Sequence, residues 1–510
     1  MRIGGLASGI DTESMIKDLM NAERIPLDKM HQDRTKLEWK RDAFRDVNKL
    51  LGNFDQNMIL NMKLSETFNK KIISSTQEDA VRATGNAGAN SGTYRINVEQ
   101  LATSAINVGA KEVQFDTEKT LSEQGITGSI TFKTYGKDSS YGDNGVKEHK
   151  YEIRDGDKLS DVVKRINDDV DSPVRMTYDE NSNKVIIEAT RTGVYNPNGK
   201  EIEFDDSEGS FFSQLGLSQD PVEVEDGVMR GGEQGAQNAK FTYNGAYEVE
   251  TQDNHYQLNG VTFQFLNKTE GEATLNVTND IDHTVEKITE FVEAYNEIVE
   301  KINESQREQV FRDFPPLTDE QKSDMSEREI ELWEEKAKSG MLRGESFLSS
   351  GLTNMRQSWY GTVKNDGAFT SLTEIGIETS SDYMDGGKLV INEADLRDAL
   401  AADPESVQRL FSNSSEGEGR GLINRLEDAV EDTIGQINQR AGTATSVSLD
   451  GYALGKRMEE INSRIENFER RLEKVESRYW RQFSEMERAI SMMNQQSDML
   501  MSNFAPGLAQ

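Results

Sequence analysis

Residues 458–504 read MEEINSRIENFERRLEKVESRYWRQFSEMERAISMMNQQSDMLMSNF, and this stretch decides how the chain folds. Apolar residues recur in it at alternating steps of three and four, the spacing of one helical face. One extra step of four, at Phe483, makes an eleven-residue unit that locally unwinds a left-handed supercoil. The repeat is carried by Met458, Ile461, Ile465, Phe468, Leu472, Val475, Tyr479, Phe483, Met486, Ile490, Met493, Leu500 and Phe504. A single helix with so narrow an apolar face buries too little surface to be stable alone, so we expect it to pair.

The other end of the chain carries a similar pattern. Asp11 is placed to cap a helix with Glu13 in its first turn, and Pro26 is expected to break or restart that helix. The apolar residues at helical spacing are Met15, Ile16, Leu19 and Met20 before the proline, and Met30, Leu37, Phe44, Val47, Leu51, Phe54 and Met58 after it. Both ends of the chain are therefore expected to form coiled-coil or bundle helices, and no strand is expected before about residue 78.

The middle of the chain has a different period. From about residue 86, apolar residues alternate with polar ones, as at Tyr94, Ile96 and Val98, which predicts half-buried strands. The Asn-Gly pairs at 244–245 and 259–260 predict turns between strands. One short helix is expected over 159–170. The middle is therefore predicted to be rich in β-structure.

Helical spacing returns at residue 281 and continues to Ile302 in steps of four and three. Thr318 is predicted to cap one helix from 319 to about 338. Asn392, and Asp403 followed by proline, mark the starts of two further helices. With 510 residues the chain is too long for one compact core, so we predict a multidomain α+β protein with helical ends around a β-rich middle.

The composition limits the classes of function. The formal net charge of -33 repels nucleic acid and anionic membrane surfaces and favours solubility. The sequence contains no run of 18 apolar residues, which is the length that would predict a membrane-spanning helix. The chain has no cysteine, which excludes disulfides and thiol chemistry. Residues 1–6 lack the apolar region of a signal peptide, so any export is expected to proceed without a cleaved one.

The sequence contains no constellation typical of catalysis or metal binding. The four histidines, His31, His149, His255 and His283, lack metal-ligand spacing and lie among polar residues, so we expect them on the surface. The acidic stretch 137–157 lacks the spacing of an EF-hand calcium loop and is interpreted as a solvated loop. The glycines of 231–235 match neither a dinucleotide fingerprint nor a P-loop. We therefore expect no enzyme activity, catalytic residue, cofactor or metal site.

Several methionines gather near the C-terminus: Met486, Met492, Met493, Met499 and Met501. They have two interpretations. They could fill the core of a helix seam, or they could form an adaptable apolar surface that binds more than one partner in turn. Both stay open, although the apolar stripe widens towards the tail.

Several local patterns together resemble one family. Residues 5–13, GLASGIDTE, are similar to the amino-terminal signature of flagellar hook-associated protein 2, the flagellar filament cap. Residues 92–102 resemble its first head strand, and 159–193, ending VIIEATRTG, resemble a flagellin-type insert motif. The segments 291–296, 372–377 and 470–495 complete the resemblance in the family's order.

The resemblance implies a secreted protein, exported unfolded through the flagellar type III channel, that sits at the filament tip as a ring-like homo-oligomer. It implies domains at 1–42 (coiled-coil leg), 43–78 (stem helix), 79–280 (β-rich head of two subdomains, the inner one about 112–225), 281–450 (helical stem) and 451–510 (second leg). Its implied partners are other copies of the chain, flagellin, hook–filament junction proteins and, at the C-terminal helix, a flagellar export chaperone.

We expect the assembly seam on the apolar faces of the two legs and the adjoining stem helix. Its residues are Met15, Ile16, Leu19, Leu37, Phe44, Leu51, Ile465, Phe468, Leu472, Val475, Phe483, Met486, Ile490, Met493 and Leu500. Two alternatives to a cap remain at this stage. A hook–filament junction protein would share the coiled ends, and an adhesin would use aromatic residues of the β-rich head to bind a host glycan.

Overall fold

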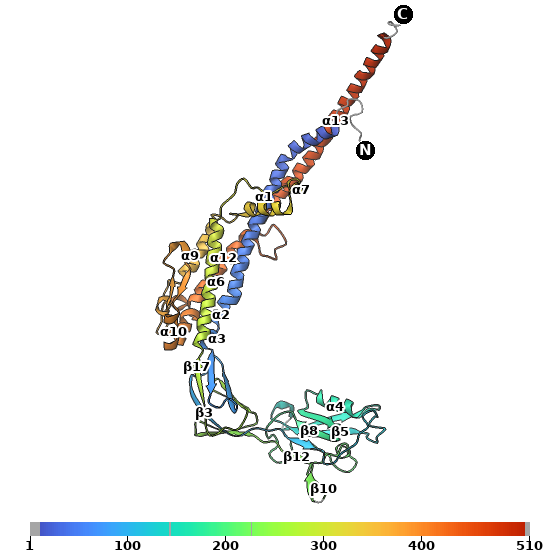
Figure 1. Ribbon diagram of the computed structural model, residues 1–510, viewed down its shortest axis with the longest axis vertical. Helices are drawn as coiled ribbons and strands as arrows, with labels where there is room; N and C mark the ends of the chain where they lie inside the picture. The colour runs from blue at the N-terminus through green and yellow to red at the C-terminus, as the bar shows by residue number, and fades with distance from the viewer. Residues whose placement is uncertain (1–10, 142–143, 226, 505–510) are drawn as a thin grey trace. The chain divides into compact units, whose positions relative to one another are not determined.

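The computed structural model describes residues 11–141, 144–225 and 227–504. They divide into two compact units (Figure 1). The helical unit consists of residues up to Phe68 together with those from Ile281 onward, and the β unit is Asn69–Asp280. The chain is therefore a multidomain α+β protein in which the β unit is inserted into the helical unit.

Two long helices define the helical unit: α1 (Thr12–Phe54) and α13 (Ala453–Phe504). A π-helical turn, η1 (Asp55–Ile59), leads α1 into α2 (Leu60–Lys63) and α3 (Ser65–Asn69). The other helices are α6 (Ile281–Arg307), α7 (Asp319–Ser323), α8 (Glu327–Lys338), α9 (Ser346–Gln357), α10 (Glu393–Ala402), α11 (Pro404–Ser412) and α12 (Leu422–Ala441). Short 3₁₀ turns, η3 (Leu372–Ile375), η4 (Tyr383–Asp385) and η5 (Gly417–Gly419), and a two-stranded sheet of β18 (Ile377–Thr379) and β19 (Leu389–Ile391) complete the unit.

The predicted helix starts are confirmed by their capping bonds. The Asp11 carboxylate accepts a hydrogen bond from the backbone N–H of Ser14 at 3.0 Å. The Asn392 side chain accepts from the N–H of Ala394, and the Asp403 carboxylate accepts from that of Ser406. Each cap satisfies a backbone donor that has no partner within its own helix.

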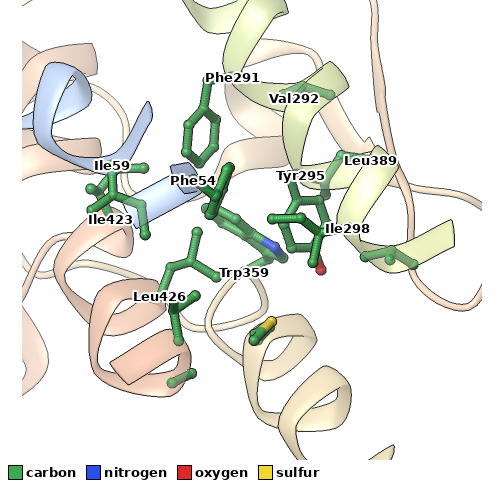
Figure 2. Packing of buried hydrophobic residues seen from close by; sticks show 14 of the residues in the cluster. Phe54, Ile59, Phe291, Val292, Tyr295, Ile298, Trp359, Leu389, Ile423 and Leu426 are labelled. Atoms are coloured by element: carbon green, nitrogen blue, oxygen red, sulfur yellow. The ribbon is translucent and has the colours of Figure 1, made fainter. Parts of the chain in front are cut away.

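The core of the helical unit lies where α1, α6, α9 and α12 meet. Figure 2 shows Phe54 of α1, Phe291 and Tyr295 of α6, and Trp359, which follows α9, converging there. The Trp359 ring meets that of Tyr295 edge to face, with centroids 5.4 Å apart, and that of Phe291 at 5.9 Å. Since these rings are buried, each contributes apolar burial as well as a favourable ring geometry.

Pro26 does not break α1, contrary to the sequence expectation. Its ring removes the N–H that would donate to the carbonyl of Ala22. The helix continues because apolar residues on both sides of the proline, Met20 and Leu27, pack in one cluster with α13. Tertiary packing here outweighs the local cost of a helical proline.

Two other expected boundaries are wrong. The expected helix 319–338 is two helices, because Ser326 accepts from the N–H of Glu329 and starts a second capping box after Thr318. The expected stem helix 43–78 is too long. The last helix ends at Asn69, and the strands β1 and β2 already lie within 71–85.

The β unit holds two groups of antiparallel strands. One group forms a five-stranded sheet of order β1-β17-β3-β13-β14 and a three-stranded sheet β15-β16-β2. These strands are β1 (Lys71–Ser75), β2 (Val81–Gly85), β3 (Gly92–Gln100), β13 (Ala239–Tyr243), β14 (Tyr247–Thr251), β15 (His255–Leu258), β16 (Val261–Phe265) and β17 (Ala273–Asn279). They share one hydrophobic core that includes Ile96, Phe241 and Phe263.

The second group forms sheets of order β12-β4-β8-β7 and β6-β5-β9, a hairpin β10-β11 and two short helices. Its elements are β4 (Ile106–Val108), β5 (Ser129–Tyr135), the 3₁₀ turn η2 (Ser139–Tyr141), β6 (Val146–Glu152), α4 (Leu159–Asn167), β7 (Val174–Asp179), β8 (Lys184–Ala189), β9 (Ile202–Phe204), α5 (Phe211–Gln214), β10 (Val222–Glu225), β11 (Val228–Arg230) and β12 (Glu233–Gln234). Its separate core includes Ile130, Val162 and Ile187. Because β4 and β12 belong to its sheet, this group extends beyond the expected range 112–225 on both sides.

The turns predicted from Asn-Gly pairs are confirmed. Asn259 and Gly260 join β15 to β16 with φ values of 51° and 78°. Asn244 and Gly245, between β13 and β14, also have positive φ values. Asparagine and glycine adopt this left-handed conformation at lower cost than other residues, which explains their use in tight hairpins.

His149 is not a surface residue. Its side chain is 5% exposed, stacks on the Phe132 ring at 5.0 Å and lies 2.8 Å from the Thr134 hydroxyl through Nε2. Burial lowers the pKa of the His149 imidazole below its usual value, with a further contribution from Lys147. The sequence pattern missed this because residue 149 occupies an inward position on β6, between polar neighbours.

Replacing Trp359 by alanine should destabilise the helical unit by about 3–5 kcal/mol, because it removes the ring against which Phe291 and Tyr295 pack. All four tryptophans, Trp39, Trp333, Trp359 and Trp480, lie in this unit, so the remaining three report its urea unfolding by fluorescence. The exposed Val390, truncated to alanine in the same unit, should change stability by only about 0.5 kcal/mol. Equal midpoints for the two variants would contradict this account of the core.

The stability of the β unit should fall as the pH drops below about 6.5, the pKa of an unfolded histidine. The unfolded chain then takes up a proton that the buried His149, with its lowered pKa, resists, so acid favours unfolding. The carboxylates Asp169 and Asp171 act in the opposite direction on this pKa but do not reverse the shift. Hydrogen exchange of β5 and β6 in urea, compared at two pH values, measures the effect.

The His149→Gln variant should lose this pH dependence, since glutamine does not titrate. His255→Gln is the matched control, because His255 is exposed in the same unit. If the two variants respond to pH alike, His149 is not the titrating group.

Candidate functional site

The terminal helices α1 and α13 pair with each other in opposite directions (Figure 1). The early part of α1 lies against the middle of α13, residues 468–483, where an apolar cluster joins them. Its members are Ile16, Met20, Leu27, Phe468, Leu472, Val475, Tyr479, Trp480 and Phe483. The pairing that the narrow stripe of α13 requires is thus met, over this stretch, within one molecule.

Polar contacts flank the cluster. The Tyr479 hydroxyl donates to the Glu23 carboxylate at 3.1 Å, which fixes the register of the two helices. The Arg478 guanidinium lies over the Tyr479 ring, 5.4 Å from its centroid. Polar contacts at the partly exposed edge of a helix pair add little stability, so the apolar cluster supplies most of the pairing energy.

The later half of α1 is held to the rest of the helical unit. The Arg45 guanidinium donates to the carbonyl of Ala441 at 3.1 Å, and Glu345 pairs with both Lys40 and Arg440. Phe44 and Leu51 are completely buried in the main core. Since no surface of these two residues remains, their assignment to an assembly seam between molecules is wrong. Leu37 packs partly buried against the same core.

Beyond Phe483 the environment of α13 changes. The helix continues past the point where α1 begins, and Met493 and Leu500 are 67% and 58% exposed. Residues 489–497, AISMMNQQS, contain no charged side chain, in a chain that is 29% charged. We call Met486, Ile490, Met493 and Leu500, which share one face of this segment, the distal stripe. An exposed apolar face without charges is typical of a surface that docks onto another.

The predicted seam residues thus fall into three groups. Buried or partly buried in the α1–α13 cluster are Ile16, Phe468, Leu472, Val475 and Phe483, and Ile465 of α13 is also buried. Exposed or half-exposed are Met15, Leu19, Met486, Ile490, Met493 and Leu500. Enclosed by the main core or packed against it are Leu37, Phe44 and Leu51. Residues 5–10 of the amino-terminal motif and residues 505–510 lie outside the described part of the chain.

The segment 308–345 forms a strap beside α1 that sequence reasoning did not find. The Trp333 indole donates to the carbonyl of Pro315 at 2.7 Å, and its ring packs against Phe314. Lys338 lies over the ring of Trp39 in α1, at 5.0 Å. A groove of about 720 Å³ runs between α1, α13 and residues 317–322. Trp39 and Trp333, isolated aromatics among charged residues, were the signal that could have revealed this contact.

The described residues offer little for chemistry. Among them, no group of three or more histidine or acidic side chains could hold a metal ion. In the acidic stretch 137–157, Asp138 accepts from the N–H of Ser140, and Asp157 pairs with Arg165, so both carboxylates serve local structure. Within the same described ranges, every helix is too short or too polar to cross a membrane.

Comparisons with known proteins bear on this arrangement. The family model described as flagellar hook-associated protein 2 N-terminus matches residues 8–105, and its C-terminus counterpart matches residues 236–495. A flagellar hook-associated protein 2 from Halalkalibacterium halodurans is 36% identical, over 97% of this chain and 98% of its own length. One from Thermotoga maritima is 24% identical, over 97% and 94%.

A solved structure shares the fold. The crystal structure of the flagellar cap protein FliD D1-D2-D3 domains from Escherichia coli covers 82% of this chain and 99% of its own, with a TM-score of 0.56 and 19% identity. At that identity the likeness speaks for the fold alone. The family models, which cover more than half of the chain, and the 36% relative, which matches it nearly end to end, establish that this chain belongs to the flagellar hook-associated protein 2 family.

Proposed function

We propose that this protein is a non-enzymatic cap subunit at the distal end of the bacterial flagellar filament. It assembles with copies of itself through its end helices into a ring-like oligomer, and it promotes ordered addition of flagellin. Membership of the flagellar hook-associated protein 2 family supports this role.

The observation that carries the proposal is the exposed distal stripe. Over residues 468–483 α13 is paired with α1, but from Met486 to Leu500 its apolar face is exposed or half-exposed. Burying one methionine or leucine side chain stabilises a contact by about 1.5–3 kcal/mol. Four such residues on one face provide a docking surface that a neighbouring subunit or the filament end can cover.

The charge of the chain complements this surface. With a net charge of -33, subunits repel one another over most of their area, so association is confined to the apolar face that carries few charges. A head-to-tail contact of this kind closes into a ring when its rotation angle divides the circle. Two further seam residues, Met15 and Leu19, are exposed on α1 and are the other candidates for contact with a neighbouring subunit.

The distal stripe also suits a succession of partners. Methionine side chains are flexible and polarisable, so they adapt to differently shaped surfaces. We assign an export chaperone to the stripe before assembly. Afterwards we assign to it other copies of the chain, flagellin at the filament end and hook–filament junction proteins. The two occupants would compete for the same face.

The role of a filament cap has a direct test. Purified protein mixed with flagellar filaments should appear by electron microscopy as added density at one tip of each filament, the tip at which flagellin adds. Filaments bearing this density should lengthen when flagellin monomer is supplied. Density along the filament sides, or at the hook end, would contradict the proposal.

Replacing Met493 and Leu500 by glutamate should weaken self-association by at least about tenfold for each position, because a charge replaces a side chain that becomes buried. Since both residues are exposed in the monomer, its stability should change by only about 0.5 kcal/mol. Sedimentation velocity over a range of concentrations measures the association. Gln495→Glu, on the opposite face of the same helix, is the charge-matched control and should associate like the parent chain.

A further inference from the structure

We propose that the methionines of the distal segment of α13 are an oxidation site, and that their conversion to sulfoxides by a peroxide prevents assembly. This inference rests on the proposed function of the stripe. Met486, Met492, Met493 and Met501 are 37%, 60%, 67% and 73% exposed. Met20, Met62, Met176, Met355 and Met458, by contrast, are buried in cores.

The chemistry requires only a peroxide and an accessible thioether. The sulfur attacks one peroxide oxygen, the O–O bond breaks, and an S–O bond forms. The sulfur loses two electrons, and the peroxide is reduced to water or an alcohol. The product, methionine sulfoxide, is polar where the thioether was apolar, and reductases can restore the original side chain.

Sulfur chemistry in this chain is concentrated in methionine. The chain has 18 methionines and no cysteine, so no thiol competes for the oxidant. Five of the 18 fall within residues 486–501. An oxidant that reaches a free subunit therefore meets its densest group of targets on the surface proposed for assembly.

Oxidation at this place has a consequence that oxidation elsewhere lacks. The exposed methionines that the structure describes outside this segment, Met15 on α1, Met229 on β11 and Met384 in η4, lie on three different elements. On the distal segment, several sulfoxides would share one face and its edges, and each would have to lose its hydration when that face is buried. Once subunits have assembled, the same burial protects the thioethers from peroxide. The methionines are therefore oxidised in the free subunit and not in the assembled one.

The test uses the full-length protein. Free subunits are treated with hydrogen peroxide, the excess is removed with catalase, sulfoxides are mapped by peptide mass spectrometry, and assembly is followed by sedimentation velocity. Sulfoxides should appear first at the exposed distal methionines, while Met62, Met355 and Met458 stay reduced. The concentration for half-maximal assembly should rise at least about tenfold, because the burial of several apolar side chains is lost.

Two variants locate the effect. When the five methionines of 486–501 are replaced by leucine (M486L, M492L, M493L, M499L and M501L), the ratio of treated to untreated midpoints should fall to one, whatever the untreated midpoint is. When Met229 and Met384 are replaced instead, the full response should remain. Treatment of the oxidised parent chain with methionine sulfoxide reductases should restore its untreated midpoint.

The outcomes separate this inference from the function on which it rests. If the untreated chain assembles and the oxidised chain assembles equally well, or if the five-leucine variant stays sensitive, the oxidation site is refuted and the proposed assembly surface stands. If the untreated chain does not self-associate at any concentration, the assembly surface is refuted, and the oxidation site with it.

Discussion

The structure depends on the burial of one narrow apolar face against another, contributed by opposite ends of the chain. Neither α1 nor α13 has a wide enough apolar stripe to be stable as a solitary helix. Together they enclose Ile16, Met20, Leu472 and Val475, and this contact brings the two ends of the sequence to the same part of the helical unit. The unpaired extension of α13 is a product of the same arrangement. The apolar face of α13 continues beyond the stretch that is paired with the described part of α1, because α13 extends further in that direction.

The insertion of the β unit is possible because its two ends meet. β1 pairs with β17, so Lys71 lies opposite Asn279, and Lys70 forms an ion pair with Asp280. The chain therefore leaves and re-enters the helical unit at one place, between Phe68 and Ile281. A unit attached in this way can change in size or surface without altering the packing around Trp359. The reason is that an inserted domain whose two ends are neighbours is joined to the host fold at one place only.

Strict periodicity made much of the fold predictable from the sequence, as in α6 and α13, and so did capping residues such as Asn392 and Asp403, whose effect is local. Features decided by distant contacts were not predictable. Pro26 stays helical because of α13, and His149 is buried because β6 turns it towards Phe132. The predicted seam mixed three environments, because Phe44, Leu472 and Met493 have the same spacing. Whether such a residue lies in the main core, in the α1–α13 pair or on an exposed surface depends on how long each helix is and which helix packs beside it.

The pairing of the first helix with the last has a consequence for synthesis. Residues near Glu23 cannot find Tyr479 until more than 450 residues of intervening chain have emerged from the ribosome. The apolar face at the start of α1, around Ile16 and Met20, is thus made early and covered last, and the nascent chain must keep it from aggregating throughout translation. A truncated product that lacks the final helix would leave this face exposed permanently. Pairing of α1 with α13 therefore requires translation to have passed Phe483, the last residue of α13 in the shared cluster.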